Sequence, residues 1–413
     1  MTAPAKAKPA MAVRLAFLNT HPIQYFAPLY AYLNRAEELS VSAVYLADYS
    51  IRGAHDRAFG RTVEWDVDLL GGYDAQFVAG AGSRGEPAGF FSMIVPQVAR
   101  HLTAQRFDAL VVHGHTPAAL LIGAAAAKMA GTAVFMRGET HLGLQRSPLK
   151  SALRTPLMGA LYRMLDGVLA IGTANAAFYR AMGVPQNRIS LVPYTVDNDR
   201  FRSQSALSAA ERAAARADLG VTDARPIVLY AAKFQPRKRP ADLLKAAALL
   251  EGEGLSFKLV MAGSGELEED LRALAASLGL KNVSFPGFVN QSALPGLYAA
   301  CDVFVLPSEN EPWGLAVNEA MCAGLPVVAS EEIGCVDDLV RDGVNGHIFQ
   351  AGDIEALAGA LQPLLRSADL RARMGVASKD IINGWSYAEC LSGIRAALSG
   401  AGLLRQAAAG AGF

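Results

Sequence analysis

Strand-like and helix-like runs alternate along almost the whole chain, and this alternation limits the fold more than any other feature of the sequence. Apolar runs typical of buried strands occupy residues 13–18, 41–46, 75–78, 109–112, 133–136, 167–171 and 189–192. Helical spacing separates most of them, for example at residues 117–129 and 174–182. Strands that alternate with helices favour a parallel, doubly wound α/β sheet.

The alternation pauses once, near the middle of the chain. A polar, alanine-rich stretch follows residues 192–198, and strand-like runs then return at 227–230, 257–261, 283–285, 303–306, 327–329 and 347–349. We therefore predict two Rossmann-like domains whose parallel sheets face each other across a cleft. The predicted organisation is a disordered tail at residues 1–10, an N-terminal domain at 11–197 and a C-terminal domain at 198–385.

The composition narrows the classes of partner. The 413 residues carry 38 basic and 38 acidic side chains, so nothing global attracts nucleic acid. The four cysteines form no C-x-x-C pair, which favours buried thiols in a reducing compartment. The most apolar window, residues 118–136, contains Lys128 and is not typical of a membrane span. We expect a cytoplasmic protein that could also lie at the inner face of a membrane.

Two acids flank a predicted helix start in residues 308–330, which read SENEPWGLAVNEAMCAGLPVVAS. Pro312 suits the first helical position, because its missing N–H would be unpaired there. The N–H groups of the next three residues would then be open to an anion or a hydroxyl; these residues are Trp313, Gly314 and Leu315. Glu311 lies just before the helix, and Glu319 lies about two turns into it on a similar face.

A second cluster of charge follows the strand predicted at residues 227–230. Four cations fall within seven residues before a helix; they are Lys233, Arg237, Lys238 and Arg239. Cations at a helix start oppose the helix dipole, which favours a bound anion over a merely solvated helix start. Gly263-Ser264-Gly265 follows another strand and, as a lone G-x-G, is a weaker phosphate-loop signal.

The stretch with the two acids closely resembles the donor-sugar motif of retaining glycosyltransferases of family 4, which have the GT-B fold. The resemblance rests on Glu311, seven residues and Glu319, followed by AMCAGLPVVAS. It implies a nucleotide-diphosphate sugar as co-substrate, with no other cofactor and no metal. It also implies that Glu311 binds the hydroxyls of the donor sugar and that Glu319 holds the ribose.

The same resemblance assigns roles to the other elements. Lys233 and Lys238 would stabilise the departing diphosphate, with Lys233 standing where the family usually has arginine and Arg239 where it has glycine. The N–H groups of residues 313–315 would orient the sugar and phosphate. The loop with Gly263 and Ser264 would lie near the nucleotide. Residues 283–289, which include Phe288, resemble the segment that reads the base, although a packed strand edge also fits.

The acceptor side departs from the family pattern. The usual Gly-Gly near the first strand is replaced by NTHPIQY at residues 19–25, and the place of the family's catalytic histidine reads FMRGETH at 135–141. The acceptor-side candidates are therefore His21, His113, His115, Arg137 and Glu139. A metal at His113 and His115 is disfavoured because no third ligand is near, and Asp66-Val67-Asp68 lacks the strand that precedes a metal-binding D-x-D.

Three further segments carry expectations with open alternatives. Residues 48–73 show no periodicity and could recognise the acceptor or form an ordered surface excursion. A basic amphipathic run contains Arg146, Lys150, Arg154 and Arg163 and could dock on anionic lipid headgroups, or pack on the sheet with solvated cations. The resemblance implies that the last helices, residues 386–413, cross back to the N-terminal domain.

The leading hypothesis is a metal-independent retaining glycosyltransferase that acts on a glycan, a lipid-linked or a small-molecule acceptor in surface polysaccharide or glycolipid synthesis. A GT-B phosphorylase or epimerase is one alternative, and a non-catalytic sugar-nucleotide-binding protein is another. A nicotinamide oxidoreductase is disfavoured, because no G-x-G-x-x-G follows any predicted strand.

Overall fold

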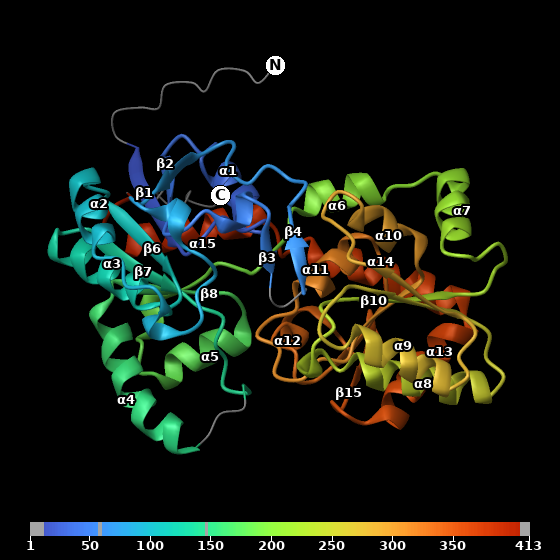
Figure 1. Ribbon diagram of the computed structural model, residues 1–413. Helices are drawn as coiled ribbons and strands as arrows, with labels where there is room; N and C mark the ends of the chain where they lie inside the picture. Colours follow the sequence, from blue (N-terminus) through green and yellow to red (C-terminus); the bar gives the residue numbers. More distant parts are fainter. Residues whose placement is uncertain (1–11, 57–59, 145–147, 405–413) are drawn as a thin grey trace, which may run out of the picture.

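Two parallel-sheet domains make up the chain and stand side by side as two lobes (Figure 1). The computed structural model describes the backbone of residues 12–56, 60–144 and 148–404, and the side chains of these residues except 54–56 and 148–154. The predicted tail at residues 1–10 therefore lies outside the described residues. The predicted α/β class with two doubly wound sheets is confirmed.

The N-terminal sheet has seven parallel strands in the order β5-β2-β1-β6-β7-β8-β9. These are β1 Val13–Asn19, β2 Leu39–Tyr45, β5 Asp74–Phe77, β6 Ala109–His113, β7 Ala133–Arg137, β8 Gly167–Ala170 and β9 Ile189–Leu191. Its helices are α1 Ala27–Leu33, α2 Gln97–Gln105, α3 Ala118–Met129, α4 Pro148–Met164 and α5 Thr173–Ala181. The predicted irregular segment contains a small antiparallel hairpin of β3 Ala54–Asp56 and β4 Arg61–Val63.

The C-terminal sheet has six parallel strands in the order β12-β11-β10-β13-β14-β15. These are β10 Ile227–Ala231, β11 Lys258–Ala262, β12 Val283–Gly287, β13 Val303–Leu306, β14 Val327–Ser330 and β15 Gly346–Phe349. Its helices are α6 Asn198–Ser205, α7 Ala209–Asp218, α8 Pro240–Gly252, α9 Glu268–Ser277, α10 Leu294–Ala300, α11 Leu315–Cys322, α12 Val336–Leu339, α13 Ile354–Arg366 and α14 Ala368–Ile382. Every residue of β10, β13 and β14 is buried, because helices cover both faces of the sheet.

The strand order reverses between β1 and β6 in one sheet and between β10 and β13 in the other. The loops after such a pair of strands diverge to opposite faces of the sheet and leave a crevice at its carboxyl edge. Both crevices are therefore places where a ligand can be held, and the predicted site residues follow these strands.

The chain passes between the domains twice, and the two passages lie against each other. Thr195 Oγ1 donates to the carbonyl oxygen of Trp385 (2.7 Å), and Asn198 Nδ2 donates to that of Ile382 (3.1 Å). Helix α15, Tyr387–Gly400, then packs against α1, β8 and β9 of the N-terminal domain. In Figure 1 it is the red helix within the lobe of blue and green strands.

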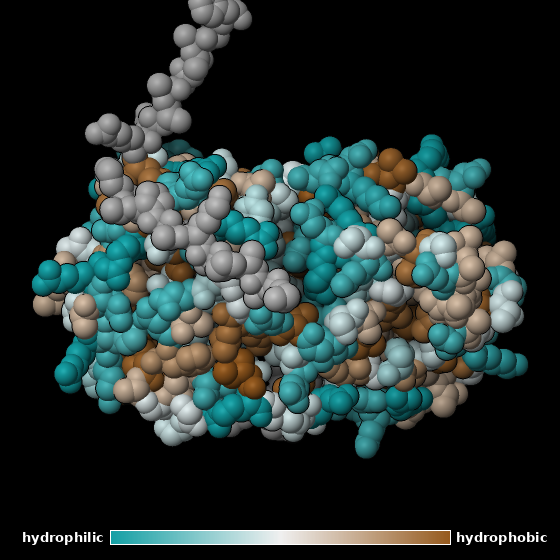
Figure 2. Space-filling model, turned by 90° about the horizontal axis from the view of Figure 1, so that it is seen from above, coloured by the Kyte–Doolittle hydropathy of each residue, from teal (hydrophilic) through white to brown (hydrophobic). Residues whose placement is uncertain are grey.

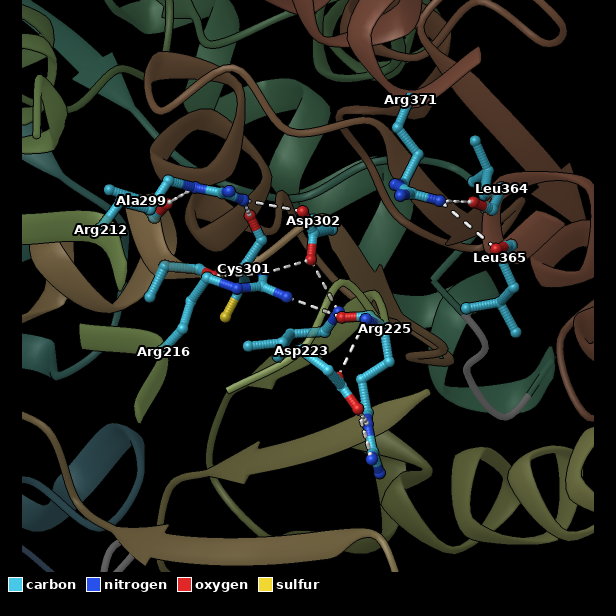
Figure 3. Close-up of polar contacts among 12 residues, drawn as sticks. Arg212, Arg216, Asp223, Arg225, Ala299, Cys301, Asp302, Leu364, Leu365 and Arg371 are labelled. Atoms are coloured by element: carbon cyan, nitrogen blue, oxygen red, sulfur yellow. Dashed lines mark hydrogen bonds and ion pairs between the residues drawn. The ribbon is translucent and has the colours of Figure 1, made fainter. Parts of the chain in front are cut away.

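A cluster of charged residues fastens α7 to the amino edge of the C-terminal sheet (Figure 3). Asp302, just before β13, accepts hydrogen bonds from Arg212 and Arg216 of α7 (both 2.7 Å) and from the backbone N–H of Ile227 (2.8 Å). Burial alone would raise the pKa of Asp302, but these bonds and the Arg216 charge outweigh it and lower the pKa. This edge is opposite the crevice, so the cluster serves the fold.

The surface seen from above is mainly hydrophilic, with hydrophobic residues gathered in the lower middle of the view (Figure 2). Among the described helices, none has the length and apolar character needed to cross a bilayer. The predicted basic amphipathic run coincides with α4, but Arg146 and the side chains of Lys150 and Arg154 lie outside the described residues.

Candidate functional site

A cavity of about 520 Å³ lies between the domains, where the carboxyl edges of the two sheets meet. Its volume is in the range of small-molecule sites, which is about 300–1,000 Å³. The predicted residues that line it are His21, Glu139, Lys233, Lys238, Gly263, Phe288, Glu311, Trp313, Gly314, Leu315 and Glu319. Predicted residues from both domains, between positions 21 and 319 of the chain, thus line one cavity.

Four predicted residues lie outside this cavity. His113 and Arg137 line a second, smaller cavity on the N-terminal side, and His115 lines neither of the two. Of the two predicted histidines, His113 alone therefore lines one of these two cavities. Ser264 is buried, and its carbonyl oxygen accepts from Phe234 N (2.9 Å), so it supports the loop from behind.

Glu311 is the centre of an ion cluster in the main cavity. Its Oε2 accepts hydrogen bonds from Lys238 Nζ and from Arg237 (2.8 Å). Burial lowers the pKa of Lys238, the charges of Arg237 and Lys233 lower it further, and Glu311 opposes the shift. Burying a cation this way is costly without an anion, and in the free protein Glu311 supplies that anion.

Three of the four cations of the β10 loop divide into two groups, and the fourth, Lys233, lines the cavity. Lys238 and Arg237 contact Glu311, whereas Arg239 turns away to Asp242 (2.6 Å) and Glu309 (2.7 Å). Arg239 has a positive φ of 48°, and this backbone conformation directs its side chain out of the cavity. Arg237 is thus a site residue that the predicted set lacked, although the cation cluster contained it.

The backbone around Glu311 is fixed from both domains. Its N–H donates to the carbonyl of Glu332 (3.2 Å), and its carbonyl accepts from Gly334 N (3.0 Å) and from His141 Nε2 (3.2 Å). A Cβ at Gly334 would lie 2.1 Å from the carbonyl oxygen of Pro312, so only glycine fits there. His141 belongs to the N-terminal domain, and its contact with the motif was not predictable from spacing.

The helix after the motif begins later than predicted. We expected Pro312 at the first helical position, but α11 begins at Leu315, with Gly314 before it at φ 94°. Trp313 accounts for the delay, because its buried ring donates Nε1–H to Asn318 (3.0 Å) and lies 5.4 Å from the ring of Trp385. Trp313 therefore lines the cavity as part of a packed junction between the domains.

Glu319 is buried and held by two tyrosines. Tyr25 of the N-terminal domain donates to Oε1 (3.1 Å) and Tyr298 donates to Oε2 (2.8 Å). Burial raises the pKa of Glu319 to about 7, and both hydrogen bonds oppose that rise. The carboxyl therefore titrates near neutral pH. Its hydrogen bond with Tyr25 links it to the N-terminal domain.

Glu319→Gln is expected to remove part of the pH dependence of stability. The proton held by Glu319 stabilises the fold fully below its usual pKa of 4.5, and this stability is lost as pH rises through about 7. The shift corresponds to about 3 kcal/mol. Urea unfolding at about pH 5 and pH 9 should show wild type losing about that much relative to the variant. If the free energy of unfolding changed with pH in the same way in wild type and in the variant, the raised pKa of Glu319 would be contradicted.

The glycine pair after β11 is required by close packing. Gly263 and Gly265 have φ of 145° and 154°, and a Cβ at Gly263 would lie 2.0 Å from the carbonyl oxygen of Ala232. At Gly265 it would lie 2.6 Å from the carbonyl oxygen of Phe234. The glycines therefore let this loop lie directly against the cation loop that follows β10.

The segment after the β3–β4 hairpin reaches across to the C-terminal domain. Asp66 accepts from the backbone N–H (3.0 Å) and the hydroxyl of Ser292, and Asn290 Nδ2 donates to the carbonyl of Glu64 (2.7 Å). The ring of Trp65 lies 6.0 Å from that of Phe288, and both line the cavity. Among the described residues, no group of three or more acids, histidines or cysteines could hold a metal.

The chain matches two family models that together span both domains. "Glycosyl transferase 4-like domain" matches residues 23–195, and "Glycosyl transferases group 1" matches residues 211–380. The putative glycosyltransferase EpsD of Bacillus subtilis is 30% identical over 273 residues, which are 64% of this chain and 70% of EpsD. The chain belongs to glycosyltransferase family 4. The predicted family is therefore confirmed, and a glycosyltransferase of the GT-B kind fits both halves.

Other relatives match about half of this chain. D-inositol 3-phosphate glycosyltransferase of Nocardia farcinica is 34% identical over 227 residues, 53% of this chain and 49% of that protein. The chain thus spans about half the length of such relatives. Among solved structures, Anabaena HepE in complex with UDP has a TM-score of 0.72 and 20% identity, over 94% of this chain and 100% of HepE. This structural similarity supports the GT-B fold of this chain.

Proposed function

We propose that this family 4 enzyme is a retaining, metal-independent transferase that uses a nucleotide-diphosphate sugar. The observation that carries the proposal is the ion cluster of Glu311, Lys238 and Arg237 in a ligand-sized cavity between the domains. A diphosphate can replace the Glu311 carboxylate on these two cations, because both ligands are oxyanions that accept charge-assisted hydrogen bonds.

The exchange would place each group where the reaction needs it. Once the diphosphate holds Lys238 and Arg237, Glu311 is free to accept from the hydroxyls of the donor sugar. Its negative charge then lies near the anomeric carbon, where positive charge develops, while the two cations stabilise the leaving group. Glu319, in the same cavity, would accept from the ribose hydroxyls in place of Tyr25. The leaving phosphate takes the proton of the acceptor hydroxyl, so no enzyme nucleophile is required.

The acceptor would enter from the N-terminal domain. His21 and Glu139 line that side of the cavity. The names of relatives include inositol phosphate and sulfoquinovosyl transferases, and HepE binds UDP and glucose in its solved complex. These names favour a polyol, glycan or lipid-linked acceptor and a hexosyl donor such as a UDP-sugar, as in surface polysaccharide or glycolipid synthesis.

A panel of nucleotide sugars tests the proposal directly. We expect one donor to be bound and slowly hydrolysed by the purified chain, with the same rate in EDTA and with retained anomeric configuration by NMR. Free nucleotide released only on addition of inorganic phosphate would instead identify a phosphorylase. Binding without any turnover of any donor, in the presence of an acceptor mixture, would contradict the catalytic function.

A further inference from the structure

A second cavity of about 230 Å³ adjoins the main one on the N-terminal side. It lies at the switch point of the N-terminal sheet, beyond β1, β6 and β7. Polar residues on its wall include Asn19, Thr20, His113, Thr116, Arg137 and Glu139. It is large enough for several waters, each of which occupies about 30 Å³ in the liquid. The volume and the polar wall together suit a small polar ligand.

Arg137 gives this cavity a buried, incompletely paired cation. The residue is 4% exposed, and its guanidinium lies over the rings of Phe26 (5.4 Å) and Tyr194 (5.1 Å). One terminal nitrogen donates to the carbonyl of Pro193 (3.1 Å), whereas Nε is buried without a hydrogen-bond partner. A buried donor without a partner is costly, and neutral carbonyls do not balance the charge. An anionic ligand in the cavity would supply the missing counter-charge.

The titratable groups nearest Arg137 do not form an ion pair with it among the contacts of the described residues. Burial lowers the pKa of His113 well below its usual value, and the charge of Arg137 lowers it further, so this imidazole is neutral. Glu139 accepts from Tyr194 Oη (2.7 Å) and makes no ion pair with Arg137 among the contacts of the described residues. Burial raises the pKa of Glu139, and the Tyr194 bond and the charge of Arg137 oppose that rise. Glu139 is exposed to the cleft and lines both cavities, so it marks their junction.

We propose that the second cavity is an acceptor subsite for an acidic sugar or polyol. A carboxylate or phosphate of the acceptor binds Arg137, and a hydroxyl of the same molecule donates to Glu139 at the junction with the donor cavity. The reacting hydroxyl is then placed within one sugar ring of the anionic group. This inference rests on the proposed glycosyltransferase function, because it needs a donor in the main cavity.

The test compares ligands that differ in one group. With the full chain saturated with UDP, saturation-transfer NMR would measure binding of glucose, glucuronate and glucose 6-phosphate. At least one acidic ligand should bind about tenfold tighter than glucose, which corresponds to about 1.4 kcal/mol. Arg137→Gln should reduce its affinity to that of glucose, whereas Arg180→Gln, on the exposed end of α5, should not. Preference for one acid identifies the group as carboxylate or phosphate.

Two controls keep the outcomes distinct. Arg137→Lys keeps the charge without the planar fork and should give intermediate affinity, which serves if the glutamine variant does not fold. Equal binding of glucose and both acids to wild type, or acid binding that Arg137→Gln leaves intact, would overturn the subsite. UDP binding by the same samples reports on the donor site, so its loss in wild type would count against the proposed function alone.

Discussion

Glu311→Gln is expected to lower the rate of sugar transfer by a factor of about 10²–10³, the usual cost of removing one preorganised electrostatic group. In the proposed reaction the carboxylate is the anion that faces the donor sugar, and the amide keeps the shape of this group without its charge. Lys238 and Arg237 lose their partner in the free variant but regain one when the diphosphate binds. Initial rates at saturating donor would measure the loss, and UDP binding would show that the site still forms.

The matched control for this variant is Glu309→Gln. Glu309 lies two residues away and pairs with Arg239, outside the lining of the cavity. The rate of sugar transfer by Glu309→Gln should remain within a few-fold of that of wild type. Similar losses in the two variants would mean that the loop as a whole, and not the Glu311 carboxylate, supports transfer. Full activity of Glu311→Gln would remove Glu311 from the reaction.

Asp302→Ala is expected to destabilise the C-terminal domain by about 3–5 kcal/mol, the cost of breaking a largely buried ion pair. The change leaves Arg212 and Arg216 near the sheet edge without their anion and removes the acceptor for Ile227 N. Urea unfolding monitored by far-UV circular dichroism would measure the loss. Because Asp302 lies at the edge opposite the cavity, UDP affinity of the folded variant should match wild type.

Asp223→Ala is the control within the same cluster (Figure 3). Asp223 pairs with Arg225 (2.6 Å), but the Asp223 side chain is 50% exposed and the pair is local in sequence. Water screens such surface pairs, so its removal should change unfolding little. If the two variants lost equal stability, the burial of Asp302 would not explain its effect.

The strands were predictable because parallel strands buried on both faces read as continuous apolar runs. All thirteen strands of the two large sheets lie within two residues of the predicted ranges, β10 and β13 among them. Glu311 and Lys238, 73 positions apart in the chain, meet because they follow these neighbouring strands. The rule that ligands lie at a switch point would have placed them together without the resemblance.

The parts that failed depend on contacts between domains or on single torsions. The late start of α11 follows from the packing of Trp313 against Trp385, which no local pattern contains. The positive φ of Arg239, not its charge, excludes it from the site that Arg237 enters. Tyr25 and His141 reach the motif across the cleft, and their spacing in sequence carries no sign of it.

The ion cluster around Glu311 also bears on the release of product after the chemical step. In the proposed reaction the nucleotide diphosphate product must leave Lys238 and Arg237, and the Glu311 carboxylate competes for the same two cations. An intramolecular competitor acts at a high effective concentration and weakens the binding of the diphosphate product. The donor is weakened less, because its sugar offers hydroxyls to the displaced carboxylate, so the competition mainly shortens the residence time of the product. Glu311, which binds the donor sugar in the proposed reaction, would thus also speed product release and return the cleft to the state that binds the next donor.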